Sequence, residues 1–172
     1  MKRFILVLAI VALVAVSVSS QSTPVGTLAD VEGSTNTGLM FVNIAGMIDN
    51  MNKGSQLYTS IEAMTKANHS VLTMVNKNGN PVVLLSVPKK NMSNPSSRNI
   101  YYMLFSYAFV QGVKIMSDDS SLLIITAMQE DGHTIYDYLF PKDLITKYLT
   151  GNTDLAEFGA KVSVHTGSAM DD

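Results

Sequence analysis

The residues of this chain that could do acid–base chemistry gather around one turn. His133 directly follows Asp131-Gly132, and Asp137 comes four residues later. A carboxylate that orients an imidazole can make it a general base, so His133 with Asp131 or Asp137 is a candidate hydrolytic pair. Polar residues also gather at solvated hairpin tips without any catalytic role. We favour this second interpretation, which makes the protein a non-enzyme.

The remaining sequence holds none of the common catalytic or ligand-binding signatures. It has no cysteine, no Gly-x-Ser-x-Gly turn and no glycine-rich phosphate loop, so a thiol nucleophile is excluded. His69 and His165 have no partner at a ligand-like spacing, and Asp118 with Asp119 lacks the spaced acids of a calcium loop. We predict no metal and no cofactor.

Aromatic residues provide a candidate binding surface. Tyr136, Tyr138 and Phe140 alternate along a predicted strand, and a predicted helix carries further aromatic residues between positions 101 and 109. Such side chains either line a groove for a ligand or partner, or fill a core with tyrosine hydroxyls at its rim. The candidate surface residues are Tyr101, Tyr102, Phe105, Tyr136 and Tyr138. Two sequons, at Asn68 and Asn91, are candidate glycosylation sites.

The first twenty residues have the order of a secretory signal peptide. Lys2 and Arg3 precede an unbroken apolar run from Phe4 to Val16, and small polar residues follow it. Thirteen residues in a helix span about 20 Å, which is short for a hydrocarbon core of about 30 Å. We expect cleavage after residue 19 or 20. The alternative is an uncleaved membrane anchor made of residues 4–18.

Composition narrows the class of partner. The formal charge is −2, and it becomes −4 once Lys2 and Arg3 are removed, because 10 basic residues then face 14 acidic ones. No basic patch is present, so we expect no nucleic-acid partner. An exported chain without cysteine has no disulfide framework, and its stability must come from a core. We therefore expect a secreted or extracytoplasmic protein, either free or anchored to the membrane by its N-terminus.

The elements that position these residues follow from periodicity and turn signals. Residues 21–38 are rich in Gly, Ser and Thr and predict a flexible polar spacer; the alternative is a spacer with one short strand around Val25 to Val31. Residues 39–166 predict one α+β domain, and 167–172 a polar tail. We expect helices over 39–51, 56–67, 96–116 and 142–149. Asn78-Gly79 and Asp131-Gly132 predict two hairpins with two-residue turns. Together with a last strand over 161–165, they give a four- or five-stranded antiparallel sheet.

The two hairpins share a spacing that suggests an internal repeat. A shift of 53 residues brings Gly79 onto Gly132, and the Pro-Lys pair 88–89 onto 141–142. This predicts an αββ duplication; chance similarity between two hairpins is the alternative. The expected order over 56–150, αββαββα, resembles that of the roadblock and profilin-like class. The resemblance covers the order of elements alone and implies a fold, not a function.

Two strands are apolar without interruption, VVLLSV over 82–87 and LLIITAM over 122–128. An antiparallel sheet with one wet face should alternate instead. These strands therefore need cover on both faces, and one helix layer supplies only one of them. The segment 39–51 or another chain must supply the other. We expect an exported, non-catalytic binding module that forms a homo-oligomer or binds a protein partner, with a secreted hydrolase as the alternative.

Overall fold

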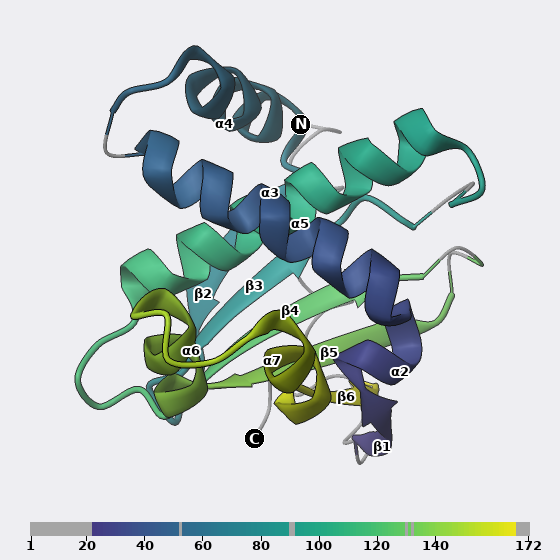
Figure 1. The fold of residues 1–172 in the computed structure, drawn as a ribbon, viewed down its shortest axis with the longest axis vertical. Helices are drawn as coiled ribbons and strands as arrows, with labels where there is room; N and C mark the ends of the chain where they lie inside the picture. Colours follow the sequence, from purple (N-terminus) through teal and green to yellow (C-terminus); the bar gives the residue numbers. More distant parts are fainter. Residues whose placement is uncertain (1–21, 52, 90–91, 130, 132, 168–172) are drawn as a thin grey trace, which may run out of the picture.

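The computed structural model describes residues 22–51, 53–89, 92–129, 131 and 133–167, and it is an α+β fold with a six-stranded mixed sheet (Figure 1). The predicted leader or anchor, the Asn91 sequon and most of the predicted tail lie outside the described residues. The elements in chain order are β1 (Thr23–Thr27), α2 (Leu28–Glu32), α3 (Ser34–Met51), α4 (Gln56–Asn68), β2 (Val71–Val75), β3 (Pro81–Leu85), α5 (Pro95–Ile115), β4 (Leu122–Met128), β5 (Ile135–Pro141), α6 (Lys142–Leu149), α7 (Leu155–Lys161) and β6 (Ser163–Thr166).

The sheet corrects the prediction of four or five antiparallel strands. Its order is β1-β6-β5-β4-β3-β2, and β3 pairs with β4 in parallel, whereas the other neighbours are antiparallel. The parallel pair arises because α5 carries the chain back along the sheet between the two hairpins, which is the crossover that parallel strands require. The sixth strand comes from residues whose composition predicts a spacer.

Residues 22–38 are therefore ordered elements of the domain. The side chains of Thr27 and Asp30 form a capping box at the start of α2, and Leu28 donates its backbone N–H to the Val162 carbonyl. β1 pairs with β6 from Thr23 to Thr27, with a bulge before Gly26. The strand partner of β1 and the carbonyl that binds Leu28 are more than a hundred residues away in the sequence, which is why the polar composition alone predicts a spacer.

The two hairpins are present, but their loops are longer than two residues. In the first, Asn76 and Asn80 close the hairpin through a backbone hydrogen bond, and Gly79 takes a φ of 77°. Three residues between the closing pair, with glycine in the left-handed region, form a bulged loop rather than a type I′ turn. In the second hairpin Gln129 donates to the Thr134 carbonyl, so four residues lie between them.

The central helix α5 packs directly on the sheet. Asn94 caps it by accepting backbone hydrogen bonds from Ser96 and Ser97, and Pro95 occupies its first position. At Gly112 a Cβ atom would lie 2.2 Å from a Leu123 methyl carbon on β4. Glycine is thus required where the helix backbone approaches the strand.

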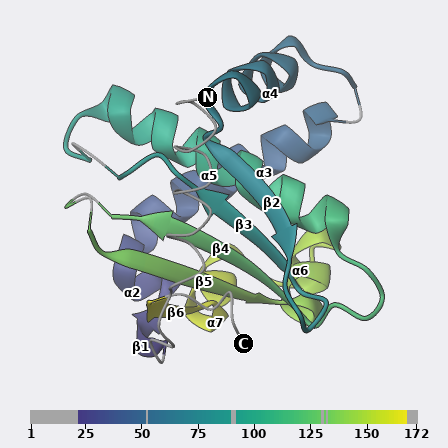
Figure 2. The same cartoon turned by 180° about the vertical axis from the view of Figure 1, so that it is seen from behind.

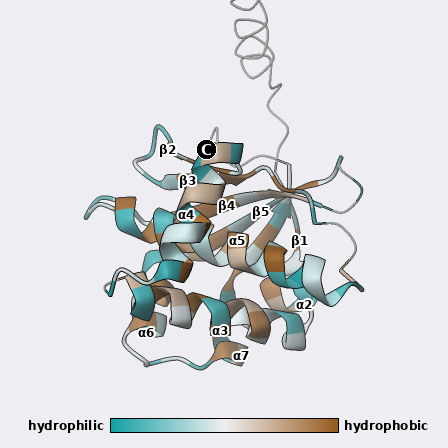
Figure 3. Cartoon of the chain, turned by 90° about the horizontal axis from the view of Figure 1, so that it is seen from above, coloured by the Kyte–Doolittle hydropathy of each residue, from teal (hydrophilic) through white to brown (hydrophobic). Residues whose placement is uncertain are grey.

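The other helices lie on the same side of the sheet as α5. Helix α3 crosses α5, and its Phe41 ring meets that of Phe109 edge to face, with centroids 6.4 Å apart. Ser106 of α5 donates its hydroxyl to the Met40 carbonyl. Figures 1 and 3 show α2, α3, α6 and α7 on this side, so the segment 39–51 adds a layer above α5. It does not cover the opposite face of the sheet.

The four predicted helices are present: α3 begins five residues before its predicted start, α4 and α5 differ from the prediction by one residue at their ends, and α6 has the predicted bounds. The order α4-β2-β3-α5-β4-β5-α6 is also the expected αββαββα. The duplication of an αββ unit stays a prediction. Helix α7 is an addition to the prediction; Asp154 caps it through the backbone N–H of Glu157.

Candidate functional site

The candidate catalytic pair lies at an exposed hairpin tip. His133 is exposed, and the Asp131 carboxylate accepts hydrogen bonds from the Thr134 hydroxyl and from the backbone N–H groups of Thr134 and His133. These bonds, that of the Thr134 hydroxyl first, lower the pKa of Asp131 to about 2. The carboxylate therefore stabilises the hairpin loop. It accepts a hydrogen bond from the backbone of His133 and does not orient the imidazole ring.

Asp137 lies in the middle of β5 and is fully buried. Its carboxylate accepts a hydrogen bond of 2.6 Å from the Thr126 hydroxyl on the neighbouring strand β4. Its register partner on the other side is His165 of β6. The structure thus brings Asp137 together with Thr126 and His165.

Most of the predicted aromatic surface is core. Tyr101, Tyr102, Phe105 and Tyr138 are buried in the main core, and Tyr136 is half-buried against it. The rings of Phe105 and Tyr138 meet edge to face at 5.2 Å between centroids. The structure places these residues together, but in the interior of the domain rather than along an exposed groove.

A buried polar cluster lies beside these rings, at the carboxyl ends of β3 and β4. The Glu32 side chain, at the end of α2, is fully buried and pairs with the Lys89 ammonium at 2.5 Å. Its other oxygen accepts a hydrogen bond of 2.6 Å from the Tyr138 hydroxyl, to which Gln129 also donates. The Tyr101 hydroxyl interacts electrostatically with Glu32 and with the neighbouring Tyr138 hydroxyl.

Burial keeps the phenols of this cluster neutral. Loss of solvation, reinforced by the nearby Glu32 charge, raises the pKa of Tyr101 and of Tyr138 well above the ordinary value. The cluster links α2, the chain after β3 and the middle of β5. Its role is therefore to hold these three segments together. Sequence reasoning missed Glu32, Lys89 and Gln129, and no local pattern marks them.

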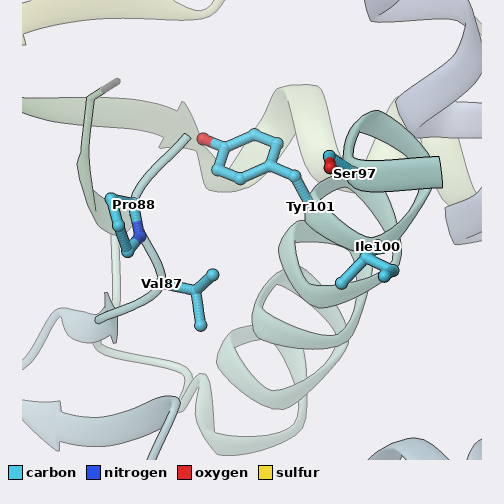
Figure 4. Close-up of a pocket in the computed structure, with 5 residues that line it drawn as sticks. All are labelled: Val87, Pro88, Ser97, Ile100 and Tyr101. Carbon is cyan, nitrogen blue, oxygen red and sulfur yellow. The ribbon is translucent and has the colours of Figure 1, made fainter. Parts of the chain in front are cut away.

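A hollow of about 290 Å³ lies next to the cluster. Figure 4 shows Val87 and Pro88, from the chain after β3, facing Ile100 and the ring of Tyr101 on α5. Its size is at the lower limit of small-molecule sites, and its walls are mainly apolar. Without converging polar groups such a hollow gives a ligand little orientation, so it is a weak candidate.

The most extensive candidate surface is the face of the sheet opposite the helices. Because side chains alternate along a strand, the residues between those of the main core point to this other side. No described helix covers it (Figure 2). We call it the helix-free face; its apolar members are Leu72 and Met74 of β2, Val82 and Leu84 of β3, Leu122, Ile124 and Met128 of β4, and Ile135 and Leu139 of β5.

The register makes this face one continuous apolar surface. Met74 stands opposite Val82, Val82 beside Ile124, and Ile124 opposite Leu139. Val82 and Ile124 form a buried centre with half-buried neighbours. At the β2 margin Leu72 and Met74 remain 45% and 41% exposed. The uninterrupted apolar strands thus do point hydrophobic residues to both sides.

The other sequence-based expectations concern metal and glycan sites. In the part of the chain that the structure describes, no group of three or more His, Cys, Asp or Glu side chains could hold a metal ion. Asn68, the described sequon, lies exposed at the end of α4 and donates its side-chain amide to the Met64 carbonyl. None of the described helices combines the length and the apolar character that a membrane-spanning segment needs.

Comparisons with known proteins leave the chain without an assigned relative. No family model matches it, and neither a curated protein nor a solved structure gives a match.

Proposed function

We propose that this chain is an exported, non-catalytic binding module that self-associates through the helix-free face. The observation that carries the proposal is the continuous apolar surface on β2, β3, β4 and β5, which no described helix covers. Around the buried centre of this face the apolar side chains are half-buried, and Leu72, Met74 and Ile135 are exposed. Contiguous apolar surface of this kind often marks an interaction site. A second copy is the occupant that this surface fits best.

The chemistry of the face supports a second copy over a charged partner. Its exposed members at the β2 margin, Leu72 and Met74, are apolar, and its one acidic group, Asp137, is buried and hydrogen-bonded to Thr126. An apolar surface without exposed charge is complementary to itself, which is what a two-fold contact requires. The mechanism of association would be removal of this apolar area from water.

The hydrolase alternative has less support from the site. His133 is exposed, the Asp131 carboxylate binds backbone N–H groups, and Asp137 is buried against Thr126. A general base needs a carboxylate that orients its ring and a cleft that holds the substrate. The exposed tip offers neither arrangement, and we therefore favour a binding module.

The oligomeric state of the protein freed of its leader tests the proposal. A full-length chain with a protease site inserted after Ser20 is cleaved and examined by sedimentation equilibrium. We expect a dimer. The variant Met74→Glu, which places a charge on the helix-free face, should be monomeric. Val75→Glu is the matched control: Val75 is the next residue of the same strand, is 58% exposed and points to the other side.

Each result of this experiment either supports or overturns the proposed self-association. A dimer that Met74→Glu abolishes and Val75→Glu retains supports the proposal. A cleaved protein that stays monomeric at high micromolar concentration overturns it, and so does a dimer that both variants weaken equally. Near-ultraviolet circular dichroism of each form establishes that the tyrosine-rich core is intact. A cleaved chain that loses this signal also counts against the proposal, because the module then does not exist without its leader.

A further inference from the structure

We infer that two copies of the chain associate edge to edge, with β2 of one copy pairing antiparallel with β2 of the other. The two six-stranded sheets would then form one continuous sheet across a two-fold axis. This inference rests on the proposed function, because it specifies the geometry of the same self-association. It assigns the contact to the β2 margin of the helix-free face, where Leu72 and Met74 are exposed.

The first support is the position of β2 in the sheet. β2 is an outer strand, and in the part of the chain that the structure describes it pairs with β3 alone (Figure 2). Val71 is half-buried, and the other four residues of the strand are exposed. An outer strand presents a row of backbone N–H and C=O groups to which another strand can bind.

The second support is a difference between the two outer strands of the sheet. β1 contains Pro24, which has no N–H to donate, and a bulge between Pro24 and Gly26 interrupts its register with β6. Proline and bulges are means by which natural proteins block edge pairing. β2 has neither of them: the sequence VLTMV contains no proline and no charged residue, and its register with β3 has no shift. β2 is thus the outer strand that is open to pairing.

The third support is the direction of the backbone groups of β2. Ser86 donates its backbone N–H to the Ser70 carbonyl, and Asn76 donates its own to the Asn80 carbonyl. Residues 70 and 76 therefore belong to hydrogen-bonded pairs with the chain of β3. Such pairs alternate along an antiparallel ladder, so the residues of β2 with odd numbers direct their backbone groups away from β3. These outward-facing residues are Val71, Thr73 and Val75.

The fourth support is that β2 is complementary to itself in the antiparallel direction. With Thr73 on the two-fold axis, Thr73 stands opposite its own copy, and Val71 stands opposite Val75 of the second copy. These are the outward-facing residues, so each opposed pair can form two backbone hydrogen bonds. On the helix-free face the same register places Leu72 opposite Met74, which removes apolar side chains of both copies from water. Neither strand holds a charge that would oppose this contact.

The variant Thr73→Pro tests the backbone contact while it leaves the apolar side chains of β2 in place. Because the Thr73 N–H points outward, proline at this position removes no hydrogen bond to β3, and an outer strand tolerates proline in this orientation. In the cleaved chain, sedimentation equilibrium should show a dissociation constant at least about tenfold higher, since hydrogen bonds are lost from both copies. Thr73→Ala is the matched control. It keeps the N–H, so its dissociation constant should stay close to that of the natural sequence.

Hydrogen exchange of the natural sequence provides an independent test that needs no variant. The backbone amides of Thr73 and Val75 should be protected at concentrations where the dimer predominates, and they should lose this protection on dilution to the monomer. The amides of Leu72 and Met74 point toward β3, so their protection should change less on dilution. Near-ultraviolet circular dichroism establishes that each variant retains its tyrosine-rich core.

Every outcome either supports the edge pairing or overturns it. A dimer that Thr73→Pro weakens and Thr73→Ala retains supports it. A dimer that Thr73→Pro leaves intact, or that both variants weaken equally, overturns it. If Thr73→Pro loses its circular dichroism signal, the exchange measurement decides: unprotected Thr73 and Val75 amides in the dimer overturn the inference.

Failure of the edge pairing is distinguishable from failure of the proposed function. A dimer that Met74→Glu abolishes but Thr73→Pro retains rejects the edge pairing and keeps self-association through the helix-free face. A cleaved chain that stays monomeric rejects both.

Discussion

Removing the Lys89 ammonium should destabilise the fold more than any surface charge change, because it leaves the Glu32 carboxylate without its ionic partner. The Glu32 side chain is fully buried and that of Lys89 is 14% exposed, with 2.5 Å between the charged atoms. An ion pair broken in the interior costs about 3–5 kcal/mol. Since Tyr138 still donates to the other oxygen of Glu32, we expect Lys89→Met to lower the free energy of unfolding by about 3 kcal/mol.

A double variant identifies the cause of this loss. Glu32→Leu combined with Lys89→Met removes the buried charge together with its partner, so the desolvation penalty of an unpaired carboxylate disappears. The Tyr138 hydroxyl then loses an acceptor, which costs about 1–2 kcal/mol. We therefore expect the double variant to be more stable than Lys89→Met alone by about 1–2 kcal/mol.

Urea unfolding monitored by circular dichroism measures these differences, and constant slopes against urea confirm that the folded and unfolded states are comparable. Lys66→Met is the control, since Lys66 pairs with Glu62 at the surface and is 72% exposed; it should unfold close to the natural chain. The reasoning is refuted if Lys89→Met loses no more stability than Lys66→Met, or if the double variant loses the sum of its two single changes.

Two further predictions concern the packing of α5 and the buried phenols. Gly112→Ala should destabilise the protein by about 2–3 kcal/mol, because its Cβ would lie 2.2 Å from a Leu123 methyl carbon; Gly46→Ala in α3, with nothing within 4 Å of its Cβ, should be neutral or stabilising in the same thermal unfolding measurement. The raised pKa values of Tyr101 and Tyr138 keep both phenols neutral in the folded state. Stability should therefore be unaffected by these groups below pH 10 and fall above it, by about 1.4 kcal/mol per pH unit for each tyrosine that ionises only on unfolding. Tyrosinate absorbance that rises for all tyrosines before the circular dichroism changes would contradict this.

Local signals in the sequence predict much of the secondary structure. Asn94-Pro95 marks the start of α5, and the apolar spacing over 142–149 defines α6. The capping pattern Asp154-x-x-Glu157 also marks the start of α7. The residues that determine these helices lie within a few positions of one another. For this reason α5 and α6 could be predicted, and α7 was predictable although it was missed.

Elements whose partners are distant could not be found in the same way. A short strand around Val25 was an alternative within the predicted spacer, but its place in the sheet follows only from the pairing of β1 with β6. The parallel pairing of β3 with β4 depends on the path of α5, which turn dipeptides do not specify. A sequence window contains neither partner, so composition favours a spacer and two separate hairpins.

The candidate sites also differ in whether their contacts are local or depend on distant segments. His133 and Asp131 were predictable as a loop pair, and the structure shows how the carboxylate is used. Tyr101 and Tyr138 were predicted as members of one surface, and the structure buries both in the core; which side of α5 and β5 faces the core depends on the packing of α3 and α5. Glu32 lies in a segment rich in Gly, Ser and Thr, and its burial follows only from the position of α2 beside β5.

Because β1 pairs with β6, this edge of the sheet forms only when both strands are present. Thr23 and Thr166, 143 residues apart, are register partners in this ladder. A chain that emerges from its N-terminus, during synthesis or threading through a pore, holds β1 without its partner until residues 163–166 are out. A product ending before Ser163 would leave unpaired edges on both β1 and β5. Such edges promote aggregation, so incomplete chains should be distinguishable from complete ones by their solubility.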